Sequence, residues 1–407
     1  MESLLENRQV RKCVIKALRA FDIGSRTAGG DYFAQEEGHW VTDSRIASPM
    51  SLYPEYQTTL KSWGADAIGS VFVEVETEDG LIGLATGFGG EPACYLIEKH
   101  FRRFVVGSDP RDIARIWDQM YRASSPYGRK GLAVSAIGAV DLALWDLLGK
   151  LRSEPVYKLI GGAVRDDLIA YCTGPCPARY KELGFFGAKV PLPFGPGEGP
   201  AGLKSNVEFL AQHRQAVGPN FPLMVDCFMS LDVGYARDLA RAVKDLDVYW
   251  FEEALHADDW EGYRQLKSAA PWVRWATGEH EYSRYGFREL IKDRAIDVLQ
   301  PDVMHVGGLT EVLRIAAMAA AYDIPVVPHC GGSYSYHFSI TQAHSPFVEY
   351  FNASTVGDQI VPSLGPMFLG EPLPEGGRIT LSNDPGWGLT LDRDTVLLRR
   401  VYNMDSE

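Results

Sequence analysis

The chain has 407 residues, of which 46% are hydrophobic and 23% charged, a length that suits two domains or one large barrel with an appended domain. Its formal net charge of −13 argues against nucleic acid or an anionic membrane as a partner, because both are polyanions. The six cysteines are scattered, no run of about eighteen apolar residues suggests a membrane span, and the charged N-terminus does not resemble a signal peptide, so we expect a cytoplasmic protein.

The N-terminal part predicts mixed α+β structure. Residues 22–50 are rich in glycine and aspartate without any period, which indicates a long loop. In residues 69–87, apolar and other residues alternate on both sides of a Glu-Asp-Gly turn, and this pattern predicts a β-hairpin. Residues 131–150 have the three-to-four spacing of a buried helix.

After residue 165, short β-branched or aromatic runs alternate with amphipathic stretches. The predicted strands lie within 168–174, 185–190, 222–227, 248–253, 274–280, 296–302, 324–330 and 347–351, and predicted helices include 206–218, 235–246 and 309–323. Alternating strand and helix implies parallel strands joined by right-handed crossovers. About eight such units favour a (β/α)₈-type barrel over a doubly wound sheet.

Polar residues end nearly every predicted strand of this barrel. They are Lys189, Asp226, Glu252, Glu279, Asp302, His329 and Glu349. The C-terminal ends of barrel strands converge on one mouth, where barrel enzymes place their active sites. We therefore expect these seven side chains to meet in one site.

Three of these residues are carboxylates on consecutive strands. Asp226, Glu252 and Glu279 are separated by 26 and 27 residues, which is one strand-helix unit each time. Three adjacent carboxylates repel one another unless a cation lies between them. All-oxygen ligation with open positions favours Mg²⁺ over zinc.

A carboxylate and an imidazole stand on two later neighbouring strands. Asp302 and His329 are 27 residues apart, again one unit. A carboxylate beside an imidazole selects its tautomer and raises its basicity. Across a barrel mouth from a metal site, we expect His329 to act as a general base.

Several motifs resemble the enolase superfamily, mandelate racemase subgroup, over essentially the whole chain. They are WFEE at Glu252, TGEH at Glu279, QPDVMHVGGLTE at Asp302, VPHC at His329, VDLALWDLLGK and PVYKLIGGAVRD. The resemblance implies an α/β fold, a modified TIM barrel (β/α)₇β over residues 151–365. It also implies an N-terminal α+β capping domain over residues 1–150, with specificity loops at about 22–63 and completed by the tail, about 366–407.

The resemblance also assigns roles. Asp226, Glu252 and Glu279 would hold one Mg²⁺ per subunit. The His329–Asp302 pair would act as acid and base. Glu349 would donate a hydrogen bond to the substrate carboxylate or enediolate, and Lys189 would contact the substrate carboxylate. Members of the subgroup commonly form homo-oligomers. The expected substrate is a small anionic sugar acid.

Within the subgroup, the motifs GGDY, IASPMS, GFxxxKxP and FGPGEG are most similar to acid sugar dehydratases of the L-rhamnonate type. Many subgroup members carry a second lysine two residues after the first, and here that position is Pro191. Racemisation needs a base on each face of the enediolate. The proline therefore favours dehydration, with His329 serving both steps, over a racemase or epimerase.

The choice of sugar acid stays open. Phe33 stands where the L-rhamnonate pattern has a histidine, and Leu60 stands at the apparent position of an arginine. Another aldonate, such as L-lyxonate or L-mannonate, is an alternative substrate, and a catalytically inactive sugar-acid binder is an alternative function. The candidate substrate-binding residues, besides Lys189, are Arg26, Asp31, Phe33, His39, Lys61 and His280.

Overall fold

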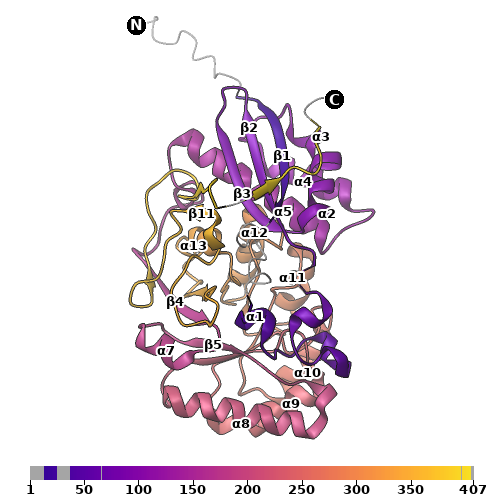
Figure 1. The fold of residues 1–407 in the computed structure, drawn as a ribbon, viewed down its shortest axis with the longest axis vertical. Helices are drawn as coiled ribbons and strands as arrows, with labels where there is room; N and C mark the ends of the chain where they lie inside the picture. Colours follow the sequence, from indigo (N-terminus) through magenta and orange to yellow (C-terminus); the bar gives the residue numbers. More distant parts are fainter. Residues whose placement is uncertain (1–12, 25–36, 66, 396, 405–407) are drawn as a thin grey trace, which may run out of the picture.

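The computed structural model describes residues 13–24, 37–65, 67–395 and 397–404 (Figure 1). An antiparallel sheet with its helices lies at one end of the molecule, and a curled parallel sheet surrounded by helices forms the rest. The predicted substrate-binding residues Arg26, Asp31 and Phe33 lie outside the described residues.

The antiparallel sheet has the order β14-β1-β2-β3. Its strands are β1 (Ile15–Gly24), β2 (Ser70–Thr77), β3 (Ile82–Phe88) and β14 (Leu397–Arg399). The register of β2 and β3 runs from Ser70 opposite Phe88 to Glu76 opposite Ile82, which confirms the predicted hairpin. The C-terminal β14 pairs with β1, with Asp22 opposite Arg399, so the tail adds the edge strand of this sheet.

Helix α5 (Leu132–Arg152) packs across the antiparallel sheet and confirms the predicted buried helix. Its residues are apolar on nearly all sides, as expected for a helix covered on more than one face. The length and hydropathy of α5 alone would allow it to cross a membrane, but 83% of its apolar window is buried inside the protein. Trp387, from the C-terminal segment, donates its indole N–H to the Leu142 carbonyl and thereby ties this segment to α5.

The parallel sheet has the order β10-β4-β5-β6-β7-β8-β9. Its strands are β4 (Leu168–Thr173), β5 (Ala188–Pro191), β6 (Leu223–Asp226), β7 (Phe251–Glu252), β8 (Trp275–Thr277), β9 (Val298–Leu299) and β10 (Val348–Phe351). The predicted strand at 324–330 appears as two parallel bridges, Leu299 to Val326 and Asp302 to His329. With β10 paired to β4, the sheet curls into the predicted modified barrel.

The remaining helices are shared between the two parts of the molecule. In chain order the α-helices outside α5 are α1 (Trp40–Asp43), α2 (Gly90–Tyr95), α3 (Arg102–Val105), α4 (Ile113–Ser124), α6 (Val156–Leu159), α7 (Pro177–Glu182), α8 (Gly199–Val217), α9 (Val233–Ala242), α10 (Trp260–Ala269), α11 (Ser283–Lys292), α12 (Leu309–Ala320) and α13 (Gly332–Ser339). The predicted helices 206–218, 235–246 and 309–323 correspond to α8, α9 and α12. α8 begins seven residues earlier than predicted, because the proline after Gly199 is accommodated in its first turn.

Three features differ from the sequence-based expectation. Strand β1 was not predicted, and its last three residues belong to the expected loop of 22–50. The same stretch contains α1 and a 3₁₀ helix at Pro49–Leu52. The tail holds the short strands β11 (Phe368–Leu369), β12 (Arg378–Ile379) and β13 (Thr390–Leu391), of which β12 pairs with β4 of the barrel. The division of the chain into capping and barrel domains at the stated boundaries stays a prediction.

Candidate active site

A cavity of about 320 Å³ opens at the C-terminal ends of the barrel strands. Residues from the barrel, the antiparallel sheet and the segment around α1 line it, so both parts of the molecule enclose it. Its polar lining includes Asp226, Glu279, Asp302 and His329, and its apolar lining includes Trp40, Val41, Ile46, Leu60, Phe88, Phe228, Met304, Phe351, Leu364 and Met367. The cavity has the mixed apolar and polar lining expected of a site for a small organic ligand.

The three predicted metal ligands meet on one side of this cavity. Asp226 ends β6 and lies in register with Glu252 on β7, and Glu279 follows β8 by two residues. Each offers one carboxylate oxygen, and these three atoms lie within 4.8 Å of one another. The parallel register explains the convergence, because neighbouring strands end at the same edge.

Lys189 is buried beneath this cluster with no exposed surface. Its ammonium forms ion pairs with Glu252, with Glu349 at 3.0 Å and with Asp226 at 3.6 Å. The structure therefore places Lys189 among the acidic side chains, and a direct contact with the substrate carboxylate stays a prediction.

The acidic cluster fits a divalent cation. Burial and the neighbouring carboxylates raise the pKa of Glu252 to about 8, although Lys189 opposes this shift. Burial raises the pKa of Glu279 to about 7, against the opposing effect of His329 and His280. Glu279 Oε2 is buried without a hydrogen-bond partner. A cation with oxygen preference would supply that partner and offset the repulsion among two buried carboxylates and the half-buried Asp226.

Two further side chains fix Glu252 in place. Gln300 donates to Glu252 Oε2 at 2.6 Å, and the Trp250 indole N–H donates to the same oxygen at 3.1 Å. With Lys189 on Oε1, the carboxylate cannot rotate without losing several hydrogen bonds. Such outer contacts orient metal ligands before a metal binds.

The predicted dyad forms on the other side of the cavity. Asp302 and His329 are bridged across neighbouring strands, and His329 Nδ1 lies 2.9 Å from Asp302 Oδ2. Burial acts to raise the pKa of Asp302, but His305 and His329 lower it to about 2, so the group is a carboxylate. It therefore accepts the Nδ1 proton and leaves Nε2 of neutral His329 as the basic atom.

Nε2 of His329 points toward the acidic side of the cavity, 3.3 Å from Glu279 Oε1. Burial acts to lower the pKa of His329, but the nearby Cys330, Glu279, Glu349 and Asp302 raise it well above its usual value. The predicted base therefore lies within hydrogen-bonding reach of a predicted metal ligand.

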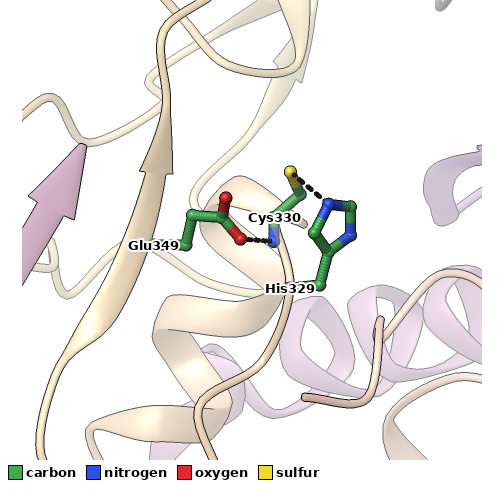
Figure 2. A group of neighbouring side chains, drawn as sticks. All are labelled: His329, Cys330 and Glu349. Carbon is green, nitrogen blue, oxygen red and sulfur yellow. Dashed lines mark hydrogen bonds between the residues drawn. The ribbon is translucent and has the colours of Figure 1, made fainter. Parts of the chain in front are cut away.

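Glu349 lies behind the dyad on β10 and is buried. It accepts hydrogen bonds from the Thr173 hydroxyl and, at 2.9 Å, from the Cys330 backbone N–H (Figure 2). Burial acts to raise the pKa of Glu349, but Lys189 and His329 lower it to about 2. An ionised Glu349 accepts hydrogen bonds, so the predicted donor role would require a proton supplied at the site.

His280 belongs to a separate pair next to the metal ligands. Its Nδ1 lies 2.7 Å from Glu253 Oε2, and Glu253 Oε1 also accepts the His280 backbone N–H at 3.1 Å. Burial acts to lower the pKa of His280, but Glu253 and Glu279 raise it to about 10. The residue is not among those that line the cavity, and its role in substrate binding stays a prediction.

Of the remaining candidate specificity residues, the two that the structure describes do not line the cavity either. His39 is buried at the start of α1, where its Nδ1 accepts the Val41 N–H and its Nε2 lies 3.3 Å from the Ala353 carbonyl. Lys61 is exposed on a 3₁₀ helix, while its neighbour Leu60 faces the cavity. Substrate contacts by His39 and Lys61 stay predictions.

Sequence reasoning missed two features of the site. One is the apolar wall, formed chiefly by Trp40, Ile46 and Leu60, which pack together with Phe228 and Phe351. Of these, the sequence singles out only the position of Leu60, because the members come from separate loops and short helices and no period marks them. The other is Cys330, which lines the cavity with its Sγ 3.2 Å from His329 Nε2. The only sequence signal was its position directly after the base.

Comparisons with known proteins agree with this geometry. Residues 51–161 match the family model described as mandelate racemase/muconate lactonizing enzyme, N-terminal domain, and residues 178–395 match enolase C-terminal domain-like. The chain is 48% identical over 393 residues to an L-rhamnonate dehydratase of Saccharopolyspora erythraea, covering 96% of this chain and all of that protein.

Solved structures give the same result. A rhamnonate dehydratase from Gibberella zeae complexed with Mg is similar at a TM-score of 0.93 and 52% identity, over 95% of this chain and 97% of that one. A 3,6-anhydro-D-galactonate cycloisomerase from Zobellia galactanivorans is similar at a TM-score of 0.74 and 28% identity, over 94% and 97% of the two chains. The chain belongs to the mandelate racemase/muconate lactonizing enzyme family of the enolase superfamily, as its motifs predict.

Proposed function

We propose that this chain is a Mg²⁺-dependent acid sugar dehydratase that removes water from an aldonate to give a 2-keto-3-deoxy sugar acid. The observation that carries the proposal is the His329–Asp302 pair facing the carboxylates of Asp226 and Glu279 across one cavity. The similarity to L-rhamnonate dehydratases over nearly the whole chain makes L-rhamnonate the first substrate to test.

Asp226, Glu252 and Glu279 would hold the metal, because their carboxylate oxygens converge. One of these oxygens, Oε2 of Glu279, is buried without a hydrogen-bond partner. When bound, Mg²⁺ supplies positive charge beside the substrate carboxylate, where negative charge develops in the enediolate. Lys189 holds Glu252 and Glu349 in position by its ion pairs.

His329 performs both proton transfers in this proposal. Nε2 takes the proton from the carbon next to the substrate carboxylate, and Asp302 stabilises the imidazolium that forms. The imidazolium then gives its proton to the hydroxyl on the following carbon, the carbon–oxygen bond breaks, and water leaves. The resulting enol tautomerises to the 2-keto acid, and neutral His329 is restored.

Pro191 supports dehydration over racemisation or epimerisation. It lines the cavity at the end of β5, directly opposite Asp226 in the strand register, and offers no acid or base. Among the described residues that line the cavity there is no lysine. Racemisation needs a second base on the other face of the enediolate, and this chain provides none at that position.

The apolar wall supports L-rhamnonate among the sugar acids. L-Rhamnonate is a 6-deoxy acid and ends in a methyl group, whereas L-mannonate ends in a hydroxymethyl group. A methyl group can make dispersion contacts with the side chains of Trp40, Ile46 and Leu60. A hydroxyl group in the same place would lose its hydrogen bonds to water, because these side chains offer it no replacement. L-Lyxonate, which is one carbon shorter, would leave this wall uncovered.

The test is turnover of L-rhamnonate, L-mannonate and L-lyxonate with Mg²⁺, followed by semicarbazide detection of the 2-keto product. We expect product from L-rhamnonate at the highest kcat/KM and no product in the presence of a chelator. Binding of all three acids without product would indicate an inactive sugar-acid binder and contradict the proposal.

We also propose that the chain works as a homo-oligomer in the cytoplasm, on a small anionic sugar acid and without nucleic acid or membrane partners. The six free cysteines support a reducing compartment, the net charge of −13 disfavours polyanions, and the family resemblance supports oligomers. Light scattering on the purified protein checks the oligomeric state, and a monomer would contradict it.

A further inference from the structure

We infer that Cys330, His329 and Glu349 form a second metal site, selective for a thiophilic divalent cation such as Zn²⁺ or Cd²⁺, whose occupation blocks the general base. The Cys330 sulfur, a ring nitrogen of His329 and a carboxylate oxygen of Glu349 lie within 4.8 Å of one another (Figure 2). The consequence for catalysis rests on the proposed function, whereas the binding site itself does not.

The distance between the sulfur and the ring nitrogen suits a shared small cation. Cys330 Sγ lies 3.2 Å from His329 Nε2, and both residues line the cavity. Zinc binds sulfur at about 2.3 Å and nitrogen or oxygen at about 2.0 Å, so ligand atoms separated by three to four ångströms can share one ion. A cation entering the cavity meets the sulfur and the nitrogen together, and a water or substrate oxygen could complete the tetrahedron.

His329 has the orientation of a metal-bound histidine. Its Nδ1–H donates to Asp302 at 2.9 Å, which directs the lone pair of Nε2 toward Cys330. Histidines that ligate metals almost always donate their other ring N–H to a carboxylate or carbonyl, because this contact fixes the tautomer and strengthens the ligand. The hydrogen bond that prepares the base therefore also prepares a ligand.

Glu349 keeps capacity for a further ligand bond. Its Oε2 accepts the Cys330 backbone N–H at 2.9 Å, while Oε1 is taken by Thr173 and Lys189. A carboxylate oxygen has two lone pairs, so Oε2 retains one. The same hydrogen bond fixes the backbone of Cys330 relative to the carboxylate.

The backbone places the sulfur at the base. Cys330 has a φ of 40°, and Gly331 and Gly332 follow with φ of 80° and 48°. A residue other than glycine is uncommon in this region and is held there by its surroundings. The turn places the thiol at the cavity lining, beside Nε2, where Figure 2 shows the sulfur joined to the ring nitrogen by a dashed line.

Ligand chemistry separates this site from the Mg²⁺ site. The cluster of Asp226, Glu252 and Glu279 offers only oxygens, which suit Mg²⁺, while a thiolate with an imidazole selects zinc-like ions. Binding releases the Cys330 thiol proton to solvent as the sulfur–metal bond forms. Because the ion then uses the Nε2 lone pair, His329 cannot accept the substrate proton.

Glu279 Oε1 also lies 3.3 Å from His329 Nε2, so the two sites adjoin. The experiment must therefore fill the oxygen site first. Cd²⁺ is titrated into the whole protein at saturating Mg²⁺, and the ultraviolet thiolate-to-cadmium absorbance is followed. We expect the band in the unaltered protein and its loss in Cys330→Ser. No band in the unaltered protein, or an equal band in Cys330→Ser, would overturn the site.

Cys176→Ser is the matched control. Cys176 is half-buried at the start of α7, with its Sγ on the Val356 carbonyl and away from the cavity lining. This variant should keep the band. Circular dichroism checks the fold of Cys330→Ser, and Cys330→Ala should lose the band as well.

The inhibition experiment uses Zn²⁺ at saturating Mg²⁺, with each variant compared to its own rate without zinc. Cys330→Ser should raise the half-inhibiting Zn²⁺ concentration by about tenfold or more, since even outer partners of metal sites contribute tenfold. Inhibition that is unchanged in Cys330→Ser, or that added Mg²⁺ relieves fully, would overturn the inference. A cadmium band without turnover of any aldonate would instead contradict the proposed function alone.

Discussion

The floor and the wall of the cavity are built in different ways. The floor consists of the charged and polar side chains at the ends of consecutive parallel strands, held by register and ion pairs, with Lys189 at its centre. Its residues are Lys189, Asp226, Glu252, Glu279, Asp302, His329 and Glu349. The wall consists of apolar side chains from loops and short helices, among them Trp40 and Leu60, held chiefly by packing and, for Trp40, by an indole N–H hydrogen bond to the Asn352 carbonyl. Strand geometry therefore determines the chemistry, and the loops can change the substrate without moving a reacting group.

The largest effect should follow from removing the base. His329→Asn keeps a polar side chain but has no basic nitrogen for Asp302 to orient. We expect kcat to fall by about 10⁴-fold, the upper range for a single acid–base group, because this residue serves both steps. Steady-state kinetics with semicarbazide detection measure the loss, and a fall of less than tenfold would assign the proton transfers to another residue.

The metal ligands should come next. Asp226→Asn removes one carboxylate from the cluster and should weaken Mg²⁺ binding by more than about tenfold, because loss of an outer partner of a metal site alone costs that much; titration calorimetry measures the affinity directly. Asp258→Asn, an exposed acid that pairs with Lys130, is the control and should bind Mg²⁺ normally. Equal Mg²⁺ affinity in the unaltered protein and Asp226→Asn would exclude Asp226 as a ligand.

Changes in the wall should affect specificity more than rate. Leu60→Asn replaces an apolar contact with an amide that can bind a terminal hydroxyl. The ratio of kcat/KM for L-rhamnonate to that for L-mannonate should fall about tenfold, the scale at which one small group is discriminated in an apolar pocket. Lys61→Ala changes the adjacent residue, which lies outside the cavity lining, and should alter the ratio less than Leu60→Asn does. A larger change of the ratio in Lys61→Ala than in Leu60→Asn would place Lys61 at the substrate.

The smallest effect concerns a buried carboxyl that holds two residues of the cavity lining. Glu371 accepts the backbone N–H groups of Ser363 and Leu364, two residues that line the cavity. Burial raises the pKa of Glu371 to about 7 from 4.5, while these two hydrogen bonds oppose the shift. The folded state thus binds the proton more tightly than the unfolded state between these pH values, and the free energy of unfolding falls as the pH rises through this range.

Glu371→Gln removes this titration. The unaltered protein should lose up to ~3 kcal/mol of unfolding free energy from this group between pH 4.5 and 7, and the variant should show a correspondingly shallower dependence. Urea unfolding at several pH values with saturating Mg²⁺ measures both. Parallel pH profiles of the two proteins would show that Glu371 titrates normally.

The floor was predictable from the sequence because it has a period. Asp226, Glu252 and Glu279 recur once per strand-helix unit directly after apolar runs, and Asp302 and His329 continue the series. The hairpin of β2 and β3 and the buried helix α5 were predictable for the same reason. The family comparisons confirm the fold and the reaction class that these motifs indicate.

The rest depends on tertiary packing. Strand β1 lies in a stretch whose charges obscure its alternation, and it is held by β2 and β14 from distant parts of the chain. The wall residues Trp40 and Leu60 meet only when their loops fold over the barrel. The ion pairs of Lys189 on β5 with Glu252 on β7 and Glu349 on β10 each reach across an intervening strand of the curled sheet, which a one-dimensional pattern does not contain.

The central claim is that one base acts on one face of the substrate. The most direct measurement is proton NMR of L-rhamnonate turned over by the unaltered protein in D₂O with saturating Mg²⁺. We expect a 2-keto-3-deoxy product and no substrate inverted at the carbon next to the carboxylate, because Pro191 offers no second base. Accumulation of the inverted sugar acid, or the absence of any keto product, would contradict it.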